Sequence, residues 1–131
     1  MGKYQERAKE LRASNERHYN CTQAVVMPFS EMLGIDEETA FRLGSNFGSG
    51  MRTGSVCGAI TGGLMVLGML GKDKPSDASG FIRRIRDNHE GMTMCADLLR
   101  VNAQRGGNKK EHCDGMVYES VEILEELLGL S

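Results

Sequence analysis

Cysteine is the residue type in this 131-residue chain whose chemistry most directly suggests a function, and it occurs at Cys21, Cys57, Cys95 and Cys113. The intervals are 36, 38 and 18 residues, so the chain contains neither the paired spacing of a zinc ribbon nor a thioredoxin-type CxxC motif. A domain of this length buries about two-thirds of its unfolded surface and builds a core without disulfides. We therefore expect the cysteines to be functional rather than structural.

Each cysteine falls in or beside the first turn of a predicted helix. First turns carry unpaired backbone N–H groups and the positive end of the helix dipole, which stabilise a thiolate and lower the pKa of a cysteine. Backbone donors near thiolate sulfur also tune the potential of an iron–sulfur cluster. One cysteine alone is best interpreted as a small buried hydrophobe, but four in this position indicate one shared site. The predicted caps before the first three are Asn20, Ser55 and Thr93, and Cys113 precedes or caps the last helix.

The rest of the sequence predicts helices and no sheet. Apolar residues recur at helical spacing, and alternating β-branched runs are absent. We expect an all-α, single-domain bundle of five to seven helices over residues 1–131, in which the uncharged run 56–70 forms the most buried helix. The predicted helical segments are 3–17, 21–33 with a break at Pro28, 36–43, 56–70, 76–90, 94–101 and 114–128.

Glycines recur around the second cysteine: Gly54, Gly58 and Gly62 come at every fourth residue. On a helix this spacing makes a stripe without side chains. Each glycine costs about 1 kcal/mol in a helix interior, so their repetition indicates a geometric requirement. Two interpretations stay open: close helix packing alone, or room for a cofactor or substrate beside Cys57, with Gly58 and Gly62 as cofactor-binding positions.

Three further residues carry weaker signals. His112 adjoins Cys113 and is the better of two histidine candidates for a ligand or a proton donor, whereas His18 ends a polar helix and is expected to be solvated. Arg52 lies in the glycine-rich segment 44–54, which lacks the ending of a phosphate-binding loop. Arg52 could neutralise an anionic site, but a solvated arginine is the favoured interpretation.

The composition excludes some classes of function. The 16 basic and 18 acidic residues are mixed along the chain, the formal net charge is -2, and aromatic residues make up 5%. Nucleic-acid binding is therefore disfavoured. The polar N-terminus does not resemble a signal peptide, and the longest uncharged run, 53–71, is too rich in glycine for a stable membrane span. We expect a cytoplasmic protein, in which four cysteines are typical of metal binding or catalysis.

The cysteine pattern as a whole resembles that of a known family. The run CGAITG at 57–62, with Cys21 upstream and Cys95 and Cys113 downstream, is similar to the redox-active proteins named for the pattern C_GCAxxG_C_C, over about residues 15–125. The name implies the order Gly-Cys-Ala, whereas this chain has Val56 before Cys57 and a glycine after it. The resemblance implies a redox-active cysteine site. A related domain accompanies haem in split-Soret-type cytochromes, where an iron–sulfur site has been inferred. This chain has no CxxCH motif, so haem is not expected.

Three functions follow from a single four-cysteine site. The leading hypothesis is electron transfer by an iron–sulfur cluster held by all four thiolates. The second is a metal-free thiol–disulfide oxidoreductase, with Cys57 as the attacking thiolate. The third is a binding module with a structural tetrathiolate zinc site. All three predict that the sulfurs converge in space, and the expected partners are a redox partner protein and a second copy of the chain.

Overall fold

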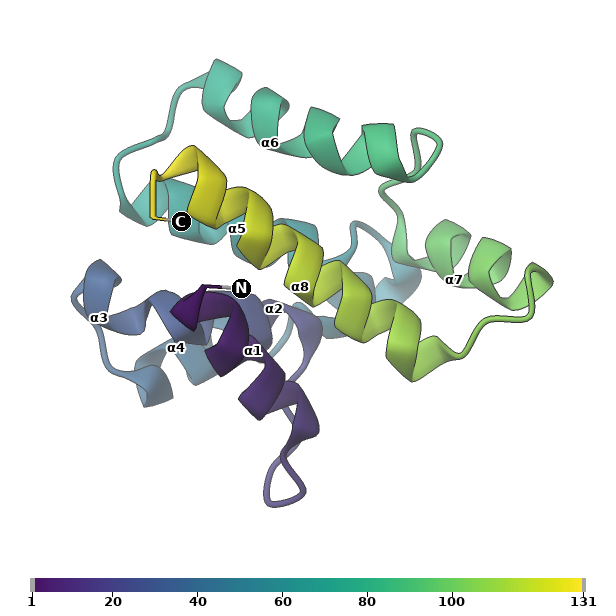
Figure 1. Ribbon diagram of the computed structural model, residues 1–131, viewed down its shortest axis with the longest axis horizontal. Helices are drawn as coiled ribbons and strands as arrows, with labels where there is room; N and C mark the ends of the chain where they lie inside the picture. The colour runs from purple at the N-terminus through teal and green to yellow at the C-terminus, as the bar shows by residue number, and fades with distance from the viewer. Residues whose placement is uncertain (1, 131) are drawn as a thin grey trace.

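The computed structural model describes residues 2–130, and in them the chain forms eight α-helices and no β-strand (Figure 1). The predicted all-α class is confirmed, but the expected five to seven helices were too few. Pro28 lies in a 3₁₀ turn, η1 (Met27–Phe29), which separates α2 from a distinct four-residue α3, because proline lacks the N–H that a continuous helix needs. The helices are α1 (Lys3–Ala13), α2 (Cys21–Val26), α3 (Ser30–Leu33), α4 (Glu37–Gly44), α5 (Gly58–Met69), α6 (Pro75–Asn88), α7 (Cys95–Gln104) and α8 (Lys109–Leu127).

Helix α2 is the most buried element, which corrects the expectation for 56–70. Every residue of α2 after Cys21 is buried, because α1, α4, α5 and α8 all pack against this short helix. Helix α5 is buried over its first turns, but its last turn reaches the surface, where Met69 is 53% exposed. The lack of charge in 56–70 therefore predicts correctly that this segment packs in the core. The packing of the other helices around α2 makes α2, and not α5, the most buried helix.

The repeated glycines bring α5 close to α2. A Cβ atom on Gly62 would lie 2.9 Å from Cβ of Val25 and 3.1 Å from the carbonyl oxygen of Thr22. A Cβ atom on Gly58 would lie 2.8 Å from the hydroxyl of Thr22. The side-chain-free stripe is thus filled by α2, and the interpretation as close helix packing accounts for both positions.

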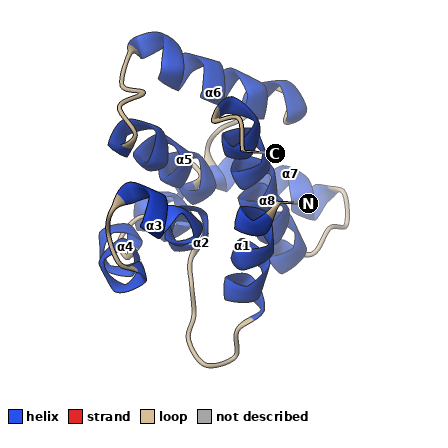
Figure 2. Cartoon of the chain, turned by 60° about the vertical axis from the view of Figure 1, so that its left-hand side comes forward, coloured by secondary structure: helices blue, strands red, loops and turns tan. Residues whose placement is uncertain are grey.

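Helix α8 is the longest helix and holds the bundle together. It packs against α1, α2, α5, α6 and α7, and Figure 1 shows it crossing the front of α5. The buried hydroxyl of Ser120 donates to the carbonyl oxygen of Ala59 at 2.7 Å, which fixes α8 on the first turn of α5. Figure 2 shows α6 as an outer layer beyond α5. None of the helices described in residues 2–130 is both long and apolar enough to span a bilayer.

Candidate functional site

All four cysteines line one small cavity. Its volume is about 40 Å³, its walls come from the starts of α2, α5 and α7 and from α8, and Lys109 and His112 also line it. All four are free thiols, with Cys57 buried and the other three partly exposed. The sulfur-bearing residues therefore lie together, as expected from the sequence, although up to 92 residues separate them.

A short antiparallel bridge links the segments that lead into Cys57 and Cys95. The amide of Cys57 donates to the carbonyl oxygen of Thr93 at 2.9 Å, and the amide of Cys95 donates to that of Ser55 at 2.7 Å. The bridge pairs Val56 with Met94. Because α5 and α7 begin immediately after it, the bridge brings the starts of both helices, with Cys57 and Cys95, to the same cavity.

Cys21 is positioned by the cap of α2 and by its neighbour in sequence. Asn20 and Gln23 form a complete capping box: the Asn20 side chain accepts from the Gln23 amide, and the Gln23 side chain accepts from the Asn20 amide, both at 2.8 Å. The buried hydroxyl of Thr22 then donates to the carbonyl oxygen of Gly58 at 2.8 Å. This contact holds the first turn of α2 against the first turn of α5, so that Cys21 faces the same cavity as Cys57.

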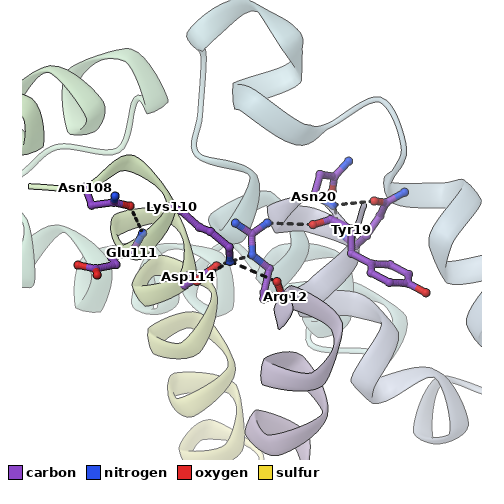
Figure 3. Close-up of polar contacts among 8 residues, drawn as sticks. Arg12, Tyr19, Asn20, Asn108, Lys110, Glu111 and Asp114 are labelled. Carbon is purple, nitrogen blue, oxygen red and sulfur yellow. Dashed lines mark hydrogen bonds and ion pairs between the residues drawn. The ribbon is translucent and has the colours of Figure 1, made fainter. Parts of the chain in front are cut away.

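Arg12 of α1 ties Cys113 to Cys21. Its guanidinium donates to the carboxylate of Asp114 at 2.7 Å and to the carbonyl oxygen of Tyr19 at 2.9 Å (Figure 3). Asp114 is next to Cys113, and Tyr19 lies two residues before Cys21. One nearly buried arginine, 9% exposed, therefore fixes the positions of both cysteines.

Cys113 and Cys21 form an interacting pair with opposite acidities. Side-chain hydrogen bonding with Cys21 is the largest cause that lowers the pKa of Cys113 to about 6. The cationic side chains of Arg12 and Lys109 lower that pKa further. The same hydrogen bond, followed by burial, strongly raises the pKa of Cys21. Cys113 is therefore the more acidic member of the pair, and Cys21 the member that keeps its proton to higher pH.

The other two cysteines are thiols rather than thiolates. Burial raises the pKa of Cys57 to about 11, although the backbone amides of Ala59 and Ile60 counteract it. Burial also raises the pKa of Cys95. The expectation that the helix start makes Cys57 acidic is therefore wrong, because removal of the sulfur from water outweighs the amides of the first turn.

Two predicted caps and one cysteine position need correction. Helices α5 and α7 begin later than expected: Cys57 and Met94 occupy their cap positions, in place of Ser55 and Thr93. Helix α8 begins earlier, because the side chain of Asn108 accepts from the amide of Glu111 at 3.1 Å (Figure 3). Cys113 thus lies in the second turn of α8, and its acidity comes from side chains rather than from the helix start.

The weaker candidates have separate locations. His112 lines the cysteine cavity, and burial lowers its pKa, which favours the neutral ring. His18 is exposed and lies outside the cavity. Arg52 also lies outside, in an exposed turn, where it donates to the carbonyl oxygen of Ser45 at 3.1 Å. His18 is exposed as expected, but it lies in the loop after α1, which ends at Ala13 and not at Arg17.

The sequence did not identify the cations that act on Cys113. Lys109 lies four residues before Cys113, so both side chains are on one face of α8, and this spacing was a usable signal. Arg12 is 101 residues away in sequence, and only the packing of α1 on α8 brings it to the site.

The cysteine cavity does not fit a metal ion as its side chains stand. Within residues 2–130, no three histidine, cysteine, aspartate or glutamate side chains are grouped as the ligands of one metal. Tetrathiolate zinc needs four Zn–S bonds of about 2.3 Å, hence sulfurs about 4 Å apart. Four thiols share this cavity, but no three of them are grouped as metal ligands among the residues that the structure describes.

Comparison with known proteins gives one family. The family model described as "Putative redox-active protein (C_GCAxxG_C_C)" matches residues 19–127, a range that includes all four cysteines and the helices that carry them. No curated protein and no solved structure matches the chain.

Proposed function

Because the chain belongs to the C_GCAxxG_C_C family of redox-active proteins, we propose that it is a thiol–disulfide oxidoreductase whose reactive pair is Cys113 and Cys21. The observation that carries the proposal is that Cys113 and Cys21 line one cavity, where Arg12 anchors the backbone beside Cys21 and the carboxylate next to Cys113; the interaction of the two side chains makes Cys113 the more acidic member of the pair, with a lowered pKa. Thiol–disulfide exchange needs one thiolate to attack and a second thiol to resolve. The pair supplies both roles at neutral pH.

The reaction follows from the two acidities. The Cys113 thiolate attacks one sulfur of a substrate disulfide, and the departing thiolate carries the electron pair of the broken S–S bond. Cys21 then loses its proton and attacks the Cys113 sulfur, forming a Cys21–Cys113 disulfide and expelling the second substrate thiol. The protein loses two electrons and the substrate gains them. Arg12, which faces both cysteines, offsets negative charge at the pair throughout the exchange.

The two remaining cysteines have a different part in this proposal. Cys57 and Cys95 stay protonated at neutral pH because burial raises both pKa values. Both line the cavity, and the segments that carry them are joined by the bridge between residues 55–57 and 93–95. Neither is required for the exchange between Cys113 and Cys21.

Trapping of the intermediate tests the proposal. Reduced protein is mixed with a small neutral disulfide, and adducts are measured by intact mass after acid quenching. Cys113→Ser is expected to abolish adduct formation, and Cys21→Ser to accumulate a mixed disulfide at Cys113, because resolution is lost. Cys95→Ser is the matched control and keeps the wild-type course. A Cys113→Ser variant that reacts at the wild-type rate contradicts the assignment.

An iron–sulfur cluster held by Cys21, Cys57, Cys95 and Cys113 is the second candidate function. The observation that favours it is the single cavity that all four line. Against it stands the side-chain arrangement, which does not group three ligands around one point, so we assign no step to a cluster or to zinc. Iron and zinc analysis of protein purified without oxygen distinguishes the candidates. Stoichiometric metal that is lost equally on substitution of any one cysteine would favour ligation over exchange.

A further inference from the structure

A second, larger cleft opens beside the cysteine cavity. It has a volume of about 480 Å³ and lies between the end of α1, the segment 14–19 and the first turns of α8. Cys113 lines this cleft and also the cysteine cavity. The reactive sulfur proposed above therefore belongs to a residue at the boundary between an enclosed space and an open one.

The cleft is lined by cationic side chains. Arg12, Arg17, Lys109 and Lys110 contribute to its wall, His18 adds a fifth basic group, and within residues 2–130 no acidic side chain lines it. Two carboxylates that do not line the cleft form ion pairs with three of these cations. Asp114 contacts Arg12 at 2.7 Å and Lys110 at 3.0 Å, and Glu38 contacts Arg17 at 3.0 Å. Four permanent cations thus face two carboxylates and the proposed Cys113 thiolate, which leaves the cleft with a net positive charge.

Two of these cations, Arg12 and Lys109, act directly on Cys113 and lower its pKa. Lys109 lies one turn before Cys113 on the same face of α8, and Arg12 holds the neighbouring Asp114. Figure 3 shows the ammonium of Lys110 directed to Asp114 and to the carbonyl oxygen of Arg12, at the junction of α1 and α8. The volume of the cleft is in the range of small-molecule sites, about 300–1,000 Å³.

We propose that this cleft binds a small disulfide carrying carboxylate groups and presents its S–S bond to Cys113. The inference rests on the proposed exchange function and names its substrate class. Carboxylates on either side of the S–S bond would pair with Arg17 and the α8 lysines, while the sulfur atoms lie over Cys113. A cationic disulfide would meet like charges at both ends.

The exchange is balanced without any further reactant. The substrate R–S–S–R, the Cys113 thiolate and the Cys21 thiol give a Cys21–Cys113 disulfide, one thiolate RS⁻ and one thiol RSH. The proton of RSH comes from Cys21, and the two electrons that reduce the substrate come from the two cysteines. One turnover can therefore be followed with reduced protein and disulfide alone.

The test uses three disulfides of similar size and different charge. These are 3,3′-dithiodipropionate, bis(2-hydroxyethyl) disulfide and cystamine, which are anionic, neutral and cationic. Each single-turnover rate with reduced protein is divided by the rate of the same disulfide with dithiothreitol, because leaving-group acidity alone changes the rate of exchange. The normalised rate for the anionic disulfide is expected to exceed that for the neutral one by about tenfold, and added salt should reduce this ratio.

A double variant changes the charge of the cleft while keeping the groups that lower the pKa of Cys113. Arg17 and Lys110 line the cleft but are not among the groups that lower the pKa of Cys113. The Arg17→Gln/Lys110→Gln variant is expected to keep the rate with the neutral disulfide and to lose most of the anionic preference. The Lys72→Gln/Arg83→Gln variant removes the same charge from exposed positions outside this cleft and should retain that preference.

The possible outcomes separate this inference from the function on which it rests. Equal normalised rates for the three disulfides, or a preference unchanged in the Arg17→Gln/Lys110→Gln variant, would overturn the cleft as the substrate site and leave the Cys113–Cys21 exchange standing. A failure of Cys113 to react with all three disulfides would overturn the proposed function and the substrate class together.

Discussion

The acidity of Cys113 can be tested by removing the group that contributes most to it. Its pKa is lowered from 9.0 to about 6, chiefly by the hydrogen bond from Cys21. At pH 7 a thiol with a pKa of 6 is about 90% thiolate, whereas one with a pKa of 9 is about 1% thiolate. Cys21→Ala removes the donor and is expected to raise the Cys113 pKa by about one unit or more, which is at least a tenfold loss in the ratio of thiolate to thiol.

The assay is the rate of Cys113 alkylation by iodoacetamide between pH 4 and pH 10, resolved by peptide mass. Because the folded pKa is lowered, reactivity is expected to be full above pH 7 and to fall as the pH drops through about 6. Cys57 should react only at much higher pH, since burial raises its pKa to about 11. Cys21→Ser keeps a hydroxyl donor and should shift the profile less than Cys21→Ala. A wild-type inflection near 9, or identical profiles for both variants, would refute the assignment of the hydrogen bond.

Two further predictions concern stability, measured by urea unfolding. Gly62→Ala places a Cβ atom 2.9 Å from Val25, so overpacking of about 1–3 kcal/mol should exceed the helix-propensity gain of about 1 kcal/mol and lower the free energy of unfolding. Gly68→Ala lies on the same helix with nothing within 4 Å of the added Cβ atom, and it should raise the free energy of unfolding. Equal effects of the two substitutions would contradict the packing argument. Asn108→Ala should lower the free energy of unfolding by about 1 kcal/mol, because the side-chain cap of α8 is lost. Asn108→Asp keeps a capping oxygen and should retain most of the wild-type stability. An Asn108→Ala variant as stable as wild type would mean that α8 does not begin at this cap.

Local signals in the sequence were sufficient for several elements of the fold. Asn20 with Gln23, and Asp36 before two acidic residues, mark helix starts through contacts within three residues. Gly34 ends α3 at a φ of 75°, a conformation that side chains with Cβ atoms rarely adopt. Such contacts can be predicted because both partners lie in one short segment. The start of α8 offered the same signal, Asn108 with Glu111, but its first turn has no apolar residue and resembled a loop.

The chemical identity of the site depended on contacts that sequence spacing does not contain. The cysteines could be grouped by their places near helix starts, yet nothing local distinguishes an acidic Cys113 from a neutral Cys57. Cys57 caps α5, where the helix start should lower its pKa, but burial raises that pKa instead. Cys113 misses that criterion, and Arg12 from the opposite end of the chain compensates. Both effects arise from tertiary packing, so a pattern of cysteines predicts a shared site without predicting which thiol reacts.

The most direct test of the central claim is to identify the disulfide that forms when the reduced protein is oxidised by one equivalent of a small disulfide. The alkylated, unreduced protein is digested, and linked peptides are identified by mass spectrometry. The Cys113 thiolate beside the Cys21 thiol predicts a Cys21–Cys113 link as the main product, with Cys57 and Cys95 recovered as alkylated thiols. A main product that links Cys57 to Cys95, or one in which Cys113 remains a free thiol, would contradict the assignment of the reactive pair.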